Sequence, residues 1–272
     1  MKHRRGNKAL SPVVSTVVIT GTIIMLVTVV LVFANNFLSI KMAESDFNAA
    51  KQFMQTVGLQ VDDVAWIIGR AETARFSSRY GQVILHQLAL NYTIYVNTTT
   101  PNVKFFTAKT GIICFNMPTS QYSVGNNYFE LIYPSNNSFL LSGASAPVAR
   151  VFTVEKIPTF DGSYVRVVVV PIIRMVNLTI DQANYVRLYL PILSKGDATS
   201  KNYPTVTLTG ESFHIQRKEN VTGIKIVVSF PFVDFDNSFF NFAQEVELIR
   251  LTGSSILDIN VGGVDVDLGV HP

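Results

Sequence analysis

The sequence contains a single cysteine, a single tryptophan and only four histidines among 272 residues. One cysteine excludes an intrachain disulfide, so the chain is not a small scaffold stapled by disulfides. Cys114 lies in the apolar run from Gly111 to Phe115. We therefore expect it to pack as a small buried hydrophobe rather than to react as a thiol.

Charged residues are also scarce, at 15% of the chain. Lys2, Arg4, Arg5 and Lys8 supply +4 of charge against a formal total of +3, which leaves −1 for everything that follows. Nucleic-acid binding favours clustered lysine and arginine, and the nearly neutral remainder argues against it. A nucleic-acid partner is therefore not expected.

Recognisable catalytic motifs are missing. The sequence contains no Gly-rich phosphate loop, no His-Glu-x-x-His, no Gly-x-Ser-x-Gly and no cysteine–histidine cluster with zinc spacing. His86 and His214 each lie in a strand-like run and are interpreted as structural. The sequence leaves one alternative open: two of the 19 carboxylates could meet in the folded chain and form an acid–base pair. We expect no enzymatic activity and no cofactor.

What the chain does have is one long apolar segment near its start. No Asp, Glu, Lys or Arg occurs from residue 9 to residue 40, and residues 13–34 are almost entirely aliphatic or β-branched. Those 22 residues would span roughly 33 Å as a helix, enough for a bilayer core of about 30 Å. The basic flank predicts a cytoplasmic N-terminus with the rest of the chain outside the cell membrane.

Three interpretations of this segment compete. A secretory signal peptide cleaved after Ala34 is one, although the uncharged run exceeds the usual apolar region of about 7 to 15 residues. An uncleaved signal anchor is the second. The third rests on Lys8-Ala9-Leu10-Ser11-Pro12-Val13-Val14, a basic leader followed at once by an apolar helix. This pattern resembles the class III leader of archaeal type IV pilins.

The resemblance covers the N-terminus only, and it departs from bacterial pilins because Val14 stands where they carry a glutamate. It implies that a prepilin peptidase cleaves between Ala9 and Leu10, with Lys8 just upstream. The helix would then stay on the mature protein and leave the membrane to form a filament core with identical or co-assembling pilins. Candidate core residues are Pro12, Val13, Val17, Ile23, Ile24, Leu26, Val30 and Phe33.

Helical periodicity continues beyond the apolar run. Apolar residues recur at alternating spacings of three and four from residue 40 to residue 71, which is a heptad pattern. The stripe includes Ile40, Phe47, Met54, Val57, Val61, Val64 and Ile68. We predict one helix over residues 10–76, its lower part packed on neighbouring subunits and its upper part on its own domain. The single tryptophan, Trp66, is expected to anchor the helix to that domain.

From residue 77 to residue 272 the sequence is typical of β structure, with short runs rich in Val, Ile, Phe, Tyr and Thr broken by Asn, Gly, Pro and Ser. The predicted fold class is α+β: a long, partly transmembrane N-terminal helix followed by an external, antiparallel β-sandwich-like domain. The aromatic run at residues 235–242 is expected to pack in its core.

Two further patterns concern the surface. Gly262-Gly263 stands at the centre of a nearly palindromic segment and predicts a two-residue hairpin turn. Such a hairpin would gather Asp258, Asn260, Asp265 and Asp267 on one face, as a weak calcium candidate against the alternative of a solvated polar face. Asn-x-Ser/Thr sequons predict glycosylation at Asn91, Asn97, Asn136, Asn177 and Asn220.

Together these observations favour a pilin-like subunit of a surface filament, in which the β domain decides adhesion or contacts between neighbours. A membrane-anchored surface binding protein with an external β domain is the alternative.

Overall fold

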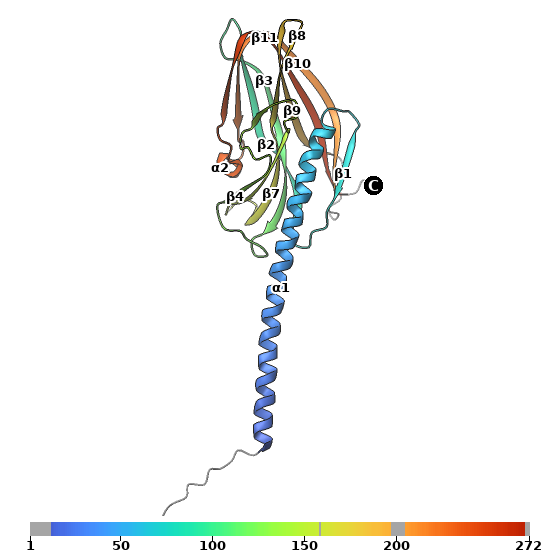
Figure 1. Cartoon of the computed structure of the whole chain (residues 1–272), viewed down its shortest axis with the longest axis vertical. Helices are drawn as coiled ribbons and strands as arrows, with labels where there is room; N and C mark the ends of the chain where they lie inside the picture. The colour runs from blue at the N-terminus through green and yellow to red at the C-terminus, as the bar shows by residue number, and fades with distance from the viewer. Residues whose placement is uncertain (1–11, 158, 197–204, 270–272) are drawn as a thin grey trace, which may run out of the picture. The chain divides into compact units, whose positions relative to one another are not determined.

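A computed structural model describes residues 12–157, 159–196 and 205–269, with side chains from Val14 onward except that of Thr252 (Figure 1). The predicted cleavage residues Lys8, Ala9 and Leu10 lie outside these ranges. The described chain forms two units that divide after Ser45. One long helix, α1 (Pro12–Val64), runs through the division, and the second unit is mostly strand.

The predicted helix end near residue 76 is wrong, because α1 ends at Val64. The chain then turns: the Gly69 amide, at φ +80°, donates to the Gly210 carbonyl at 2.7 Å, and residues from Ala71 pair with a strand. Ile68 continues the heptad spacing but is 66% exposed. Competition from strand pairing therefore overrides a helical pattern that sequence alone would extend.

The second unit is built on one sheet of eleven strands. The sheet order is β4-β6-β7-β3-β2-β10-β11-β9-β8-β5, with β1 added on β10. The strands are β1 (Ala71–Arg75), β2 (Gln82–Asn97), β3 (Val103–Pro118), β4 (Tyr128–Tyr133), β5 (Leu140–Ser142), β6 (Ala149–Glu155), β7 (Tyr164–Pro171), β8 (Ile173–Ile180), β9 (Ala183–Lys195), β10 (Thr205–Ser229) and β11 (Val246–Leu268).

The α+β class is confirmed, whereas the antiparallel sandwich is not. Hydrogen bonding joins all the described strands into a single mixed sheet, in which β11 pairs with β9 and β5 with β8 in parallel. The sheet also curls, because the Leu193 amide of β9 donates to the Thr110 hydroxyl of β3 at 2.9 Å although three strands separate β9 from β3 in the sheet order. Such long-range pairing carries no local sequence signal.

Two cores lie on the two faces of this sheet. The first is enclosed by the strands, the short helices η1 (Val233–Phe235) and α2 (Asn237–Phe240), and the aromatic side chains of Phe235, Phe239, Phe240 and Phe242, so the predicted aromatic core is confirmed. Cys114 is buried there as predicted, and burial raises the pKa of its thiol to about 12. The second core lies between the opposite face and α1.

Candidate assembly helix and its anchorage

The first half of α1 presents apolar side chains in every direction. It is the one described helix that is long and apolar enough to cross a membrane. The predicted core residues Val17, Ile23, Ile24, Leu26, Val30 and Phe33 are each more than half exposed. Pro12 and Val13 form the start of the helix, where proline needs no amide hydrogen bond; their side chains lie outside the description.

Polar side chains within this segment satisfy their donors locally. The hydroxyls of Thr22 and Thr28 donate to the carbonyls of Val18 and Ile24, each at 2.9 Å. Such back-bonding leaves neither donor unpaired in an apolar medium, where an unsatisfied polar group costs several kcal/mol. The segment therefore suits a bilayer or a dry helix bundle equally well.

The second half of α1 buries the predicted stripe in the core between helix and sheet. Phe47, Met54, Val57, Val61 and Val64 are all fully buried. The two end residues of the stripe, Ile40 and Ile68, are instead exposed. Burial of each such side chain contributes about 1.5–3 kcal/mol, so the helix from Phe47 onward is part of the domain's fold.

Close backbone approach shapes this contact. A Cβ added at Gly58 would lie 2.7 Å from a methyl carbon of Val151 in β6. Past the end of the helix, Cβ atoms added at Gly210 and Gly262 would overlap the carbonyl oxygens of Ile67 and Ala65. Glycine at these two positions of β10 and β11 therefore lets the carbonyls that follow α1 lie directly on the sheet.

Charged side chains of α1 tie the helix to three separate parts of the domain. The Asp46 carboxylate accepts from the Ser78 hydroxyl at 2.6 Å and from the Arg79 amide at 3.1 Å. Lys51 donates to Glu130 of β4 at 2.5 Å, and this hydrogen bond lowers the pKa of Glu130. Each contact fixes the rotation of the helix about its axis, which burial of an apolar stripe alone would leave less defined.

The third contact is a bidentate ion pair. Arg174 of β8 donates to both carboxylate oxygens of Asp62, each at 3.0 Å, while the indole of Trp66 donates to Asp62 at 2.7 Å. The Arg174 guanidinium lies 5.7 Å from the Trp66 ring, and that ring packs edge-on against Tyr189. Trp66 is therefore the predicted anchor, but its partner Arg174 carried no sequence signal.

We expect Asp62→Ala to destabilise the β domain by about 1–3 kcal/mol, because Arg174 loses the two carboxylate acceptors in a partly buried site and keeps only the Ala146 carbonyl. Asp63→Ala is the matched control, since Asp63 is the next residue of α1 and is exposed. Urea unfolding of the full chain in detergent measures both. Equal midpoints for the two variants would contradict the assigned anchorage.

The predicted Gly262-Gly263 turn is wrong. Both glycines lie inside β11, which runs unbroken from Val246 to Leu268, and they pair with Phe213 and Ser212 of β10. The local dipeptide matches a hairpin turn, but Gly262 serves the close approach to Ala65 described above, and Gly263 lies against Ser212 of β10. Tertiary packing of this kind is invisible in the sequence.

The calcium candidate loses its geometry with the turn. Asp258 is buried and accepts from Arg217 at 2.7 and 3.0 Å, with Arg187 at 3.7 Å. Asn260 donates to the Leu188 carbonyl, and Asp265 accepts from the Ser194 hydroxyl. Asp267 lies further along the same strand and is buried. Within the described ranges, no group of three His, Cys, Asp or Glu side chains could hold a metal ion.

Burial divides the five sequons into two classes. Asn136, Asn177 and Asn220 are exposed. Asn91 and Asn97 are half-buried: the Asn91 amide nitrogen, where a glycan would attach, donates to Ser229, and Asn97 accepts from the Asn102 amide. A glycan needs a free amide nitrogen on an accessible surface.

We therefore expect glycans at Asn136, Asn177 and Asn220 and none at Asn91. Glycopeptide mass spectrometry of protein from the native host measures the occupancy of each site, with recombinant bacterial protein as the unmodified reference. Occupied Asn91 beside unoccupied exposed sites would contradict this ranking.

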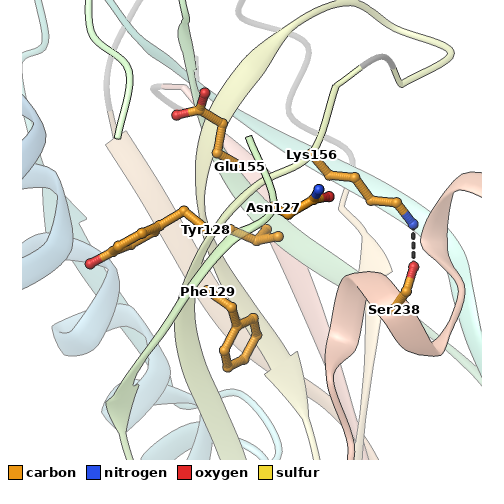
Figure 2. A pocket seen from close by; sticks show the side chains of 7 residues that line it. Asn127, Tyr128, Phe129, Glu155, Lys156 and Ser238 are labelled. Atoms are coloured by element: carbon orange, nitrogen blue, oxygen red, sulfur yellow. Dashed lines mark hydrogen bonds between the residues drawn. The ribbon is translucent and has the colours of Figure 1, made fainter. Parts of the chain in front are cut away.

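One small pocket lies beside β4, β6 and α2, with a volume of about 290 Å³ that includes open solvent (Figure 2). Its lining residues are Asn127, Tyr128, Phe129, Val154, Glu155, Lys156 and Ser238. Figure 2 shows Lys156 reaching the Ser238 hydroxyl, and Lys156 also pairs with Asp236 at 3.2 Å. Ser238 in turn donates to Asp236 at 2.6 Å. Asp236 also accepts from the Phe239 amide at 3.1 Å, so the arrangement caps α2.

Comparison with protein-family models, with curated proteins and with solved structures gives no match for this chain.

Proposed function

We propose that this chain is a structural subunit of a type IV pilus-like surface filament, as a major or minor pilin that assembles through its N-terminal helix. The observation that carries the proposal is the difference in burial between the two halves of α1. From Val14 to Ile40 its apolar side chains are exposed on all sides, and from Phe47 onward it is built into the core of the β domain.

This arrangement supports assembly for an energetic reason. An exposed apolar surface must lie in lipid or against other apolar surface, and removing it from water is worth about 25 cal/mol per Å². A cleaved leader would free the helix from its basic flank and let it exchange lipid for helices of other subunits. The partners of this route are the membrane before assembly, a prepilin peptidase, and identical or co-assembling pilins, with the β domain on the extracellular face.

The N-terminus of the mature native protein tests the route. Edman or mass-spectrometric sequencing is expected to find a start at Leu10. A start near Asn35 would indicate simple secretion, and an intact leader would indicate a plain membrane anchor.

A charge within the apolar segment tests assembly itself. Ile24→Glu places a carboxylate in the predicted core, at a cost of about 2.5–3.5 kcal/mol in an apolar layer. We expect surface filaments to disappear from electron micrographs of the native host. Thr56→Glu, an exposed position on the domain half of the same helix, is the control and is expected to keep them. Filaments that survive Ile24→Glu, or deletion of the chain, would refute the proposal and favour a membrane-anchored binding protein.

A further inference from the structure

Part of the sheet carries a row of positive charge on a single face. Register aligns Lys104 of β3 with Tyr95 of β2. Tyr95 is in turn aligned with Lys225 of β10, which is aligned with Leu248 of β11. Because directly paired residues of antiparallel strands point to the same face, this row places both lysines on one surface. The Lys225 ammonium lies 5.8 Å from the centre of the Tyr95 ring, and Leu248 is exposed.

Two further cations stand on the same face. Lys109 of β3 is aligned with Asn91, which lies four residues before Tyr95 on β2. Arg250 lies two residues after Leu248 on β11. Side chains alternate between the faces of a sheet, so these even spacings keep both cations on the face of Tyr95. With strands about 4.8 Å apart and a rise of about 3.4 Å per residue, the four cations fall within about 20 Å by about 15 Å.

These positive charges have no neutralising acid beside them. We define the basic face as Lys104, Lys109, Lys225 and Arg250. Three of the four side chains are exposed and Lys225 is half-buried. Within the described ranges, no carboxylate forms an ion pair with any of them. Glu247 precedes Leu248 on β11 and so points to the opposite face, where it accepts from the Ser138 hydroxyl at 3.2 Å.

The basic face serves neither core. The core under α1 includes residues 113–117 of β3 and 206–208 of β10, but none of residues 104–109 or 223–229. The first core takes the opposite side of the same segments, through Ile94, Ile224 and Ile226. The sequons with expected glycans, at residues 136, 177 and 220, lie outside residues 91–97, 104–109, 223–229 and 246–250. Packing therefore does not account for this concentration of charge.

We infer that the basic face binds an acidic polysaccharide, a polymer whose carboxylate or sulfate groups recur along an extended chain. Cations spread over such an area match charges repeated along a polymer, whereas one small anion would need them to converge on a point. A single exposed ion pair contributes little, but several on one chain act together. The Tyr95 ring and the exposed Thr107 hydroxyl add an apolar surface and a hydrogen-bonding group for sugars. This binding goes beyond filament assembly, since it belongs to the β domain.

Nucleic acid is the competing polyanion, and the face suits it less well. Single strands bind through several aromatic rings on which successive bases stack. Tyr95 is the one ring on this face among the described residues, because Phe105 and Phe106 of β3 pack against the first core. A surface four strands, or about 15 Å, across is too wide to enter a major groove of about 12 Å.

Binding of fluorescent polymers to the full chain in a nonionic detergent tests the inference, with bacterial protein that carries no glycans. The probes are alginate, dextran sulfate, uncharged dextran and single-stranded DNA, followed by fluorescence anisotropy. At least one acidic polysaccharide is expected to bind, and its affinity is expected to fall about tenfold or more between about 50 mM and about 200 mM salt. Binding of uncharged dextran, affinity insensitive to salt, or tighter binding of DNA than of either acidic polysaccharide would overturn the inference.

The basic leader also attracts polyanions, so its charges are removed from every protein compared. Each protein therefore carries Lys2→Gln, Arg4→Gln, Arg5→Gln and Lys8→Gln. In this background Lys104→Glu/Lys109→Glu is expected to weaken binding about tenfold or more. Arg75→Glu/Lys218→Glu is the matched control, because it makes the same change of net charge at exposed positions outside the face. The control is expected to change the affinity less than about twofold.

Equal losses in the two double variants would overturn the inference, because binding would then follow net charge and not this face. Urea midpoints of both variants verify that each is folded. A glycan found at Asn97 of the native protein would also overturn it, since Asn97 is aligned with Gly223 beside Arg250 and a glycan there would cover the face. A chain that binds as expected but forms no filaments in its host would refute the proposed function and leave the basic face standing.

Discussion

Gly262→Ala is expected to cost the β domain about 3 kcal/mol or more, one of the largest losses for any single methyl group in this chain. The added Cβ would overlap the carbonyl oxygen of Ala65 and crowd its carbonyl carbon and side chain. Backbone atoms at the end of a helix cannot rotate away, so either α1 or β11 must shift. Overpacking of a well-filled core typically costs about 1–3 kcal/mol, and a backbone obstacle belongs at the upper end.

Gly263→Ala is the matched control for this prediction. It lies next in the same strand, but its added Cβ meets the hydroxyl of Ser212, which is the end of a small side chain. We expect a loss of about 1 kcal/mol, largely restored by the second substitution Ser212→Ala. The urea midpoints of Gly262→Ala, Gly263→Ala and the Gly263→Ala/Ser212→Ala double variant give the comparison, provided that the dependence of the unfolding free energy on urea concentration is unchanged. Equal losses at the two glycines would refute the close packing of α1 on β11.

The functional consequence concerns how α1 is held. Burial of the stripe fixes which face of the helix meets the sheet, and Asp62 and Lys51 fix its rotation. The glycines fix where the helix ends along the strands. In the proposed filament subunit this contact would transmit load between helix and domain, and a contact determined in all these respects is rigid. Gly262→Ala is therefore a variant that loosens the helix without touching its apolar half.

Local periodicity predicted a long helix and the buried stripe from Phe47 to Val64 correctly, and it failed at the helix end, where non-local packing decides. Phe47, Met54 and Val57 follow a repeat that reports burial regardless of partner. Ile68 follows the same repeat, yet the chain has already turned toward β1, because Gly69 and Ala71 find partners on β10. A local helical pattern carries no information about a strand partner more than 130 residues away in the sequence.

In the β domain, too, local patterns were predicted correctly and non-local pairing was not. Alternating apolar runs indicated strands, but the parallel pairing of β9 with β11 joins segments about 70 residues apart and leaves no local trace. Glycine has no Cβ, which favours a tight turn and also permits close packing of backbones. The sequence Gly262-Gly263 therefore matched a turn although it lies inside a strand. Nothing near Arg174 or Arg150 in the sequence indicates the partner of either side chain, because those partners lie on distant segments.

Arg150→Ala is the second large expected effect, a loss of about 3–5 kcal/mol. Arg150 lies on β6 and is fully buried, with no described carboxylate paired to it. Its guanidinium donates instead to the carbonyls of Asn137 at 3.2 Å and Phe240 at 2.8 Å. The rings of Phe129, Phe152 and Phe242 surround it at 4.9–5.6 Å.

Burial lowers the pKa of Arg150 to about 10, which still leaves it charged at neutral pH. A buried cation is costly unless its donors are used, and here carbonyl oxygens and aromatic faces offset that cost. Its hydrogen bonds attach the end of α2 to β6, and α2 carries aromatic side chains that complete the first core. Alanine would therefore remove the donors and leave a cavity among the phenylalanines.

Arg150→Met separates the two causes. Methionine keeps most of the volume but donates nothing, so we expect a loss of about 1–2 kcal/mol, smaller than the loss for alanine. If the methionine variant is instead more stable than the parent, the cost of burying the charge exceeds the stabilisation from its hydrogen bonds. The attachment of α2 must then rest on aromatic packing alone. Urea midpoints together with near-ultraviolet circular dichroism, which reports the order of the aromatic cluster, decide between these outcomes.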